Sequence, residues 1–371
     1  PNCEWANFDP HTEHLKTQGI PYFYSSDYLD TNSRQGSDKA ATGLLRTIWG
    51  HDFVGVGDIR SYVAPVWIEG GIREAEHLLS VWDALYEQEK PDIVQVLHTN
   101  SFFARLAAYV ATQKGIPTIG HAEGRLRHAD QSTMGKQSLA GDYLPKLFVW
   151  SDGMKQAYID SGVDERKLEV VGIVHLSNWI RDNSPETRLS IRHSLGIRND
   201  WDIVTFALPI LNRYEGNASL AIETVINWVS HKKINLICKF HPFESAQNVN
   251  SIRNGVEKNG LSNVVVIQDG ESAPILMTSN LVISQHSTAG SEALAFNVPF
   301  AEIDLDNVGI LEGLSNEGVA FSIGKGEIGK LDKILSAELQ LDNSVVERWR
   351  VDNLGPLDGR AVEKTVEKIE K

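Results

Sequence analysis

The sequence predicts an α/β protein made of two Rossmann-like, doubly wound parallel-sheet domains that face a central cleft. Three observations lead to this prediction. Short β-rich runs alternate with longer amphipathic runs along the chain, which is typical of α/β folds. The alternation stops over residues 175–200, a polar stretch without a strand pattern, and then starts again. A length of 371 residues also favours two domains over one.

The composition fits a soluble globular protein, with 42% hydrophobic and 23% charged residues. The net charge of −14 argues against a nucleic-acid partner and against broad adhesion to anionic lipid. No apolar run approaches the roughly 20 residues that span a bilayer, and no signal-peptide pattern is visible. Cys3 and Cys238 lack the spacing of a disulfide framework or of a metal site, so we expect a cytoplasmic protein. The start at Pro1 leaves open that the sequence is a piece of a longer polypeptide.

The first predicted domain, residues 1–175, reads as consecutive βαβ units. Apolar residues at helical spacing predict helices over 74–90 and 101–115, and Gly115 is a C-cap candidate for the second. A shorter helix is expected over 152–162. The expected strands lie within 91–100, 116–124, 146–151 and 167–175.

After a linker over 176–200, the same alternation predicts a second domain over 201–345. Its expected strands are 201–211, 234–242, 263–270, 279–287 and 298–305, and its expected helices are 217–232, 245–259 and 289–296. Residues 346–371 are predicted as a charged C-terminal helix. Ligands of open parallel sheets bind beyond the carboxyl ends of the strands. The polar loops at those ends are therefore the candidates for chemistry.

One such loop joins a strand that ends near Ser284 to a helix that begins near Ala289. Its candidate ligands are Ser287, Thr288, Gly290 and Glu292. Ser287 or Thr288 can be the N-cap, which leaves backbone N–H groups that suit an anion, and the glycine lets a phosphate come close. Glu292, one turn into the helix, can accept hydrogen bonds from a ribose. The alternative is a well-capped core helix without a ligand.

A second loop, Lys-Phe-His-Pro over 239–242, follows another strand of the same domain. Pro242 biases His241 toward an extended backbone, which fixes the direction of the imidazole. A histidine there can donate to a phosphate, and Lys239 can add positive charge. The alternative is a structural histidine in a turn.

Three further strand-end loops, within 96–103, 119–128 and 208–217, carry polar and charged residues. Their candidates are Asn100, His121, Glu123, Arg125, Asn212 and Arg213. A carboxylate between a histidine and arginines can serve as general base or nucleophile. The same groups can instead form a plain ion-pair network. No metal-binding motif is present, so we expect no metal.

From about residue 70, the order of these motifs resembles the GT-B superfamily, which includes nucleotide-sugar glycosyltransferases and UDP-N-acetylglucosamine 2-epimerases. Residues 91–127 look like the epimerase stretch in which a strand, a helix and a strand lead to a His-x-Glu loop. Residues 239–242 and 284–299 look like the donor-binding half of bacterial surface-glycan transferases, such as capsule Kdo and sialic acid transferases and CDP-glycerol polymerases. The resemblance implies that the nucleotide phosphates are held by His241, Pro242, Ser287 and Thr288.

Two departures from the epimerase pattern bear on the activity. The pattern has a catalytic aspartate where this sequence has Asn100, and a His-Arg pair where it has Asn212 and Arg213; Glu123 is matched. Epimerisation needs the proton-transfer groups that are missing here. The resemblance therefore implies a glycosyltransferase that moves a sugar from a CMP- or UDP-linked donor to a hydroxyl of a bacterial surface glycan, such as capsule or lipopolysaccharide. The Lys and His-Pro pairing leans toward cytidine, and uridine stays open.

In this interpretation Glu123 is the general base or the nucleophile, His121 and Arg213 assist in catalysis, and Arg125 and Asn100 help to bind substrate. The expected partners are the nucleotide sugar and a glycan or glycolipid acceptor on the first domain, with no cofactor and no nucleic acid. Peripheral association with the inner membrane through partner proteins stays open. Two alternatives remain: an epimerase or hydrolase related to UDP-N-acetylglucosamine 2-epimerase, and a non-catalytic subunit that binds nucleotide sugars.

Overall fold

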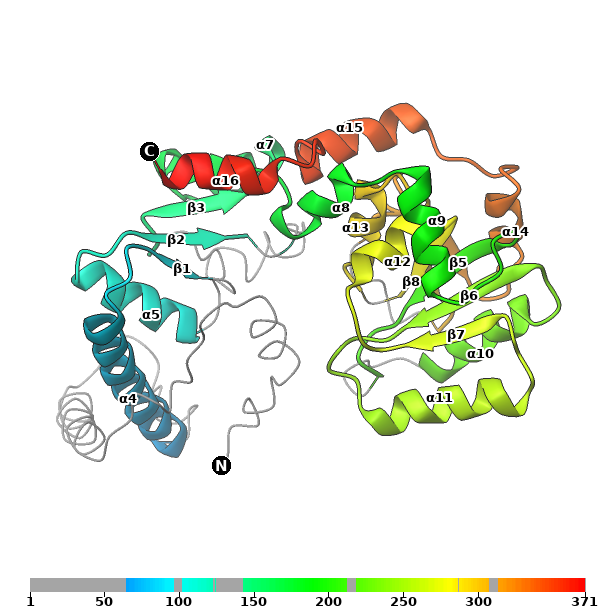
Figure 1. The fold of residues 1–371 in the computed structure, drawn as a ribbon, viewed down its shortest axis with the longest axis horizontal. Helices are drawn as coiled ribbons and strands as arrows, with labels where there is room; N and C mark the ends of the chain where they lie inside the picture. Colours follow the sequence, from blue (N-terminus) through cyan, green and yellow to red (C-terminus); the bar gives the residue numbers. More distant parts are fainter. Residues whose placement is uncertain are drawn as a thin grey trace, which may run out of the picture. The chain divides into compact units, whose positions relative to one another are not determined.

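The computed structural model describes residues 65–96, 102–122, 124, 143–211, 218–285, 287–306 and 313–370. These residues form an α/β fold with two parallel sheets (Figure 1), which confirms the predicted fold class. The strand order is β1-β2-β3-β4 in one sheet and β10-β9-β8-β5-β6-β7 in the other. The chain divides into two compact units, Pro1–His121 with Ala140–Pro145 and Ala122–Leu139 with Lys146–Lys371.

The first unit contains α4 (Pro65–Glu89), β1 (Val94–Val96), α5 (Phe102–Gln113) and β2 (Thr118–His121). β1 and β2 pair in parallel, and α4 packs against α5. The Tyr86 hydroxyl of α4 donates a hydrogen bond to the carbonyl of Ala107 in α5 at 3.2 Å, and burial raises the pKa of Tyr86 to about 12. After α5, Gly115 takes a φ of +73°, which fits the predicted end of that helix.

The second unit begins with β3 (Lys146–Val149), α7 (Asp152–Asp160) and β4 (Leu168–Val170). A short 3-10 turn, η5 (Val174–Leu176), leads into the predicted linker over 176–200, which contains no strand and folds as two helices, α8 (Ser177–Arg181) and α9 (Pro185–Ser194). The α9 helix begins with Ser184 as N-cap and proline at the first helical turn, a combination that favours helix initiation.

The larger sheet consists of six strands, all paired in parallel. They are β5 (Asp202–Ala207), β6 (Ile234–Lys239), β7 (Val264–Ile267), β8 (Leu281–Ser284), β9 (Phe300–Asp304) and β10 (Phe321–Gly324). From β5 the chain builds outward through β6 and β7, and then returns to the other side of β5 through β8, β9 and β10 (Figure 1). The strand order therefore reverses between β5 and β8, and such a reversal is where open α/β sheets bind ligands.

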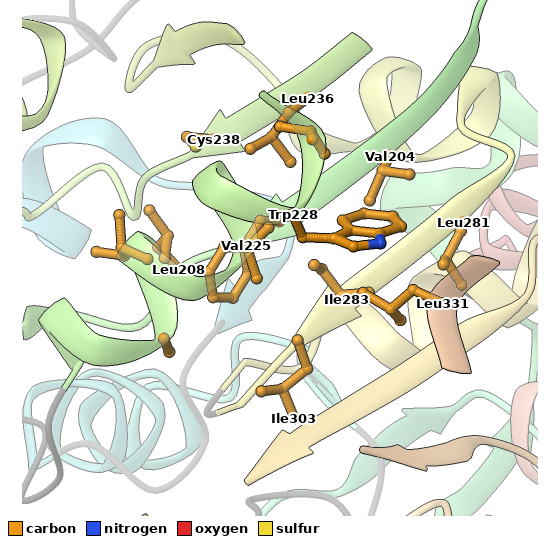
Figure 2. Packing of buried hydrophobic residues seen from close by; sticks show 14 of the residues in the cluster. Val204, Leu208, Val225, Trp228, Leu236, Cys238, Leu281, Ile283, Ile303 and Leu331 are labelled. Atoms are coloured by element: carbon orange, nitrogen blue, oxygen red, sulfur yellow. The ribbon is translucent and has the colours of Figure 1, made fainter. Parts of the chain in front are cut away.

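Five helices belong to this sheet: α10 (Ala218–Val229), α11 (Ala246–Lys258), α12 (Ser272–Thr278), α13 (Ala289–Ala295) and α14 (Lys330–Leu335). The main core lies between α10 and one face of the sheet (Figure 2), where Val225 and Trp228 pack among strand residues such as Val204, Leu236 and Ile283. Ile203 and Ile237 point to the other face and pack with Ile275 of α12. This alternation follows from the period of two along a strand.

Two helices close the chain, α15 (Asn343–Leu354) and α16 (Ala361–Ile369). The prediction of one helix over 346–371 is therefore wrong: α15 ends at Leu354 with Gly355 as its C-cap, and α16 begins only at Ala361. The Ser177 hydroxyl of α8 donates to the carbonyl of Gly359 at 2.7 Å and accepts from the backbone N–H of Ala361 at 3.0 Å. These two hydrogen bonds therefore join the start of α16 to the start of α8. Within the described ranges, no helix combines the length and apolarity that crossing a membrane requires.

Candidate functional site

A pocket of about 200 Å³ lies in the second unit, at the carboxyl ends of β5 and β6. Six residues that the sequence singled out line it: Lys239, His241, Pro242, Ser287, Thr288 and Glu292. They come from the end of β6, from the loops after β6 and β8 and from the start of α13. The pocket is thus at the reversal of strand order, where the parallel topology favours a ligand.

The turn after β6 fixes the direction of His241. The backbone N–H of Phe243 donates to Nδ1 of His241 at 3.1 Å, and the backbone N–H of Glu244 donates to the His241 carbonyl at 3.0 Å. Because Nδ1 accepts, the neutral ring carries its proton on Nε2, which makes Nε2 a hydrogen-bond donor. The phosphate contact that the sequence predicted for this imidazole stays a prediction.

A buried carboxylate that the sequence analysis did not select supports this turn. Glu244 accepts hydrogen bonds from the Leu211 backbone N–H at 2.6 Å and from Nδ2 of Asn248 at 2.7 Å. Burial acts to raise the pKa of Glu244, but these hydrogen bonds and those from Ser245 outweigh it and hold the pKa below its ordinary value. The ionised Glu244 therefore ties the turn after β6 to Leu211, in the connection that follows β5.

The Lys239 ammonium is directed toward the loop after β7. It donates to the carbonyl of Gln268 at 2.5 Å and lies 3.4 Å from the carbonyl of Asp269. Lys239 is buried, and this burial lowers its pKa, against an opposing effect of Asp269. The Gln268 amide in turn donates to the carbonyls of Pro242 and Glu244 at 3.2 and 2.7 Å. Lys239 thus lines the pocket while it holds two loops together.

The link between β8 and α13 follows the predicted boundaries, with β8 ending at Ser284 and α13 beginning at Ala289. Thr288 occupies the N-cap position, but its side chain makes no capping hydrogen bond. The Ser287 hydroxyl instead accepts from the backbone N–H of Ala289 at 3.2 Å. Thr288 is exposed and Ser287 half-buried, so both hydroxyls lie where the pocket opens.

Gly290 and Glu292 have different surroundings. Gly290 is buried against the ring of Phe300 and is not among the residues that line the pocket. Glu292 lines the pocket, and its Oε1 lies 3.6 Å from Nε2 of His175 in η5. The predicted ligand contact of Gly290 stays a prediction.

His121 ends β2 in the first unit and is buried, which lowers its pKa and favours the neutral ring. The other predicted residues, Asn100, Glu123, Arg125, Asn212 and Arg213, lie outside the described residues. The catalytic roles of His121, Glu123 and Arg213 therefore remain predictions.

Sequence reasoning did not identify Ser272 and Leu276 of α12, which also line the pocket. The signal was available, because Asp269, Gly270 and Glu271 form a polar loop directly after a strand, as in the other motifs. Nε1 of the Trp179 indole donates a hydrogen bond to Oε2 of Glu271 in this loop at 2.6 Å.

No protein-family model and no curated protein matches this sequence. Solved structures do match its fold. UDP-GlcNAc 2-epimerase from Neisseria meningitidis, bound to UDP-GlcNAc, is 16% identical with a TM-score of 0.56, over 80% of this chain and 81% of that chain. The S. aureus MnaA–UDP structure is 15% identical with a TM-score of 0.53, over 80% of this chain and 78% of that chain.

Anabaena HepE in complex with UDP-glucose is 15% identical with a TM-score of 0.45, over 82% of this chain and 88% of that chain, and this likeness is too loose to argue from. At such identities, the likenesses show a shared fold. The chain has the GT-B fold that the sequence predicted.

Proposed function

We propose that this chain is a nucleotide-sugar enzyme, a glycosyltransferase that moves a sugar from a nucleotide donor to a glycan hydroxyl. The observation that carries the proposal is that Lys239, His241, Ser287, Thr288 and Glu292 converge on one pocket at the reversal of strand order. These five polar side chains come from two separate strand-to-helix segments, β6 with its following loop and the β8–α13 link with the start of α13.

The pocket has the donors that a leaving phosphate needs. His241 offers Nε2–H, and Ser287 and Thr288 offer hydroxyls. Lys239 also lines the pocket, and its ammonium, which donates to the Gln268 carbonyl, adds positive charge. In the transfer, the bond between the anomeric carbon and the phosphate oxygen breaks, and the acceptor oxygen bonds to that carbon. The negative charge that develops on the phosphate is then stabilised by groups already in place. The acceptor proton goes to a base, for which Glu123 is the candidate.

Two considerations guide the choice of the nucleotide-sugar donor: the ligands bound in structures of the same fold, and the hydrogen-bond donors that line the pocket. One structure of the same fold holds UDP-GlcNAc and another holds UDP, so UDP-sugars are the first donors to test. CMP-sugars are the second, because a monophosphate leaving group fits the same set of hydroxyl and imidazole donors.

Transfer is favoured over epimerisation by the residues at two positions. Asn100 and Asn212 stand where the epimerase pattern has an acid and a histidine. An amide side chain does not ionise near neutral pH, so neither position can act as the general acid or base that epimerisation requires.

Calorimetric titration with UDP, CMP, CDP and GDP tests the binding site. We expect one of them to bind, and His241→Ala and Ser287→Ala to weaken binding by about tenfold each, as the loss of a hydrogen bond to a charged group does. Ser336→Ala, on the exposed turn after α14, is the control and should bind normally. Failure of all four nucleotides to bind would overturn the proposal.

The reaction type is tested separately. UDP-GlcNAc incubated with the protein alone should stay intact, and a glycan acceptor should trigger release of UDP. Release of UDP with an epimerised sugar in the absence of acceptor would replace transfer with epimerisation.

A further inference from the structure

His175 lies beside the pocket, although no motif in the sequence pointed to it. Its Nε2 is 3.6 Å from Oε1 of Glu292, within ion-pair distance and longer than a hydrogen bond. Both side chains reach solvent, since the His175 side chain is 49% exposed and the Glu292 side chain 22% exposed. His175 belongs to η5 and Glu292 to α13, and both elements are in the second unit.

The imidazole of His175 packs against a buried aromatic side chain. The ring of Trp150 packs against it, with centroids 5.8 Å apart and planes tilted by 53°. Trp150 is itself fixed, because its Nε1 donates to the carbonyl of Ala122 at 2.9 Å. Two residues after His175, Ser177 is bonded to the segment before α16. The position of His175 is therefore set by buried neighbours, while its edge faces Glu292.

We propose that His175 is a positioning residue for ribose recognition: it orients the Glu292 carboxylate, which accepts hydrogen bonds from the ribose hydroxyls of the nucleotide. This inference rests on the proposed function. Glu292 comes four residues after Thr288, one helical turn beyond the hydroxyl cluster. The transferred sugar and the nucleoside lie on opposite sides of the phosphates. We therefore assign the pair to the nucleoside side and not to the reacting carbon.

The pair of His175 and Glu292 also has an electrostatic effect when a phosphate is bound. A carboxylate near a bound phosphate is repelled by it. An imidazole at 3.6 Å offsets that repulsion when it is protonated, and its ring limits the rotamers that Glu292 can adopt when it is neutral.

The test compares ribonucleotides with their 2′-deoxy forms. UDP and CMP are titrated into the full chain, each against its 2′-deoxy counterpart. For the nucleotide that binds, we expect the wild-type protein to prefer the ribose form by about tenfold. His175→Ala should reduce this preference several-fold, with less than a twofold change for the 2′-deoxy form. A purely structural role would weaken both forms alike.

Two further variants complete the design. His175→Gln keeps an N–H donor and should retain part of the preference; it also covers the case in which the alanine variant does not fold. His193→Ala removes an exposed histidine of α9 and should leave the preference unchanged. An unaltered ribose preference in His175→Ala, an equal loss for both forms, or a wild-type protein that binds both forms equally would each overturn the inference. All three outcomes leave nucleotide binding, and so the proposed function, intact; absence of any nucleotide binding would overturn both.

Discussion

Gly290 packs so closely on Phe300 that a β-carbon at position 290 would lie 2.4 Å from Cε1 of the phenyl ring. The contact joins the first turn of α13 to β9, directly behind the pocket. A glycine is required here by the distance between helix and sheet. This packing need is separate from the close approach of a phosphate for which the sequence singled Gly290 out.

Gly290→Ala should therefore destabilise the protein. Phe300 is 1% exposed and cannot move aside without disturbing β9, so we expect a loss of about 1–3 kcal/mol in the free energy of unfolding, as for other overpacked cores. Gly255→Ala is the matched control, since Gly255 lies inside α11 with nothing within 4 Å of its β-carbon position. There, helix propensity predicts a gain of about 0.5–1 kcal/mol. Urea denaturation measures both, and equal shifts would contradict the packing argument.

Gly355 marks a second close approach, between the end of α15 and Trp150. A β-carbon on Gly355 would lie 2.0 Å from the carbonyl oxygen of Trp150, and the residue has a φ of +75°. Gly355→Ala meets both strain and a backbone clash, and we expect it to cost about 3 kcal/mol or more. Gly326→Ala, with a φ of +81° and open space around it, meets only the strain and should cost about 1 kcal/mol. Thermal unfolding compares them; a Gly355 variant as stable as the Gly326 variant would show that the α15 end does not pack as described.

The ion pairs of Glu169 predict a pH-dependent contribution from α16. Lys368 donates to Oε2 of Glu169 at 2.7 Å and Lys146 to Oε1 at 3.2 Å. The hydrogen bond from Lys368 lowers the Glu169 pKa most, burial opposes it, and Lys146 lowers it further. Because the pKa is lower in the folded state, the contribution is present above the ordinary value of about 4.5 and is lost as pH falls through the folded pKa.

Lys368→Met should therefore destabilise the protein by less than about 1 kcal/mol at pH 7, since all three side chains are partly exposed. The difference from wild type should shrink toward zero as pH falls from the ordinary value through the lowered folded pKa of Glu169. Urea midpoints at several pH values measure it, with Lys258→Met on exposed α11 as the control. A difference that grew on acidification would have the wrong sign for this ion pair.

Cys238 should be an inert thiol in the folded protein. It lies on β6 with no exposed surface, and burial raises its pKa to about 12. Since the thiolate is the reactive form, a Cys3→Ser variant, which keeps Cys238 as its single cysteine, should not react with Ellman's reagent at pH 8. In urea it should release one equivalent of chromophore. Rapid reaction of the native variant would show that the β5–β6 core opens far more often than its packing implies.

Much of the second unit could be predicted from local pattern. The strands β5, β6 and β8 are mainly apolar runs followed by polar residues, and such runs are typical of strands buried on both faces. Short elements were missed. The α12 helix has seven residues and contains Pro274, and β10 has four residues after a turn-rich stretch. Neither is long enough to show a clear period.

The sequence by itself determined at which edge of the sheet the polar loops lie, because every parallel strand ends at the same edge and its next loop begins there. His241, Ser287, Thr288 and Glu292 follow from that rule. Only the tertiary structure decided what each group touches: Glu244 on the Leu211 amide, His175 beside Glu292, and Gly290 against Phe300. These contacts join residues from separate elements, and their distances depend on strand order and helix packing, which no local pattern in the chain encodes.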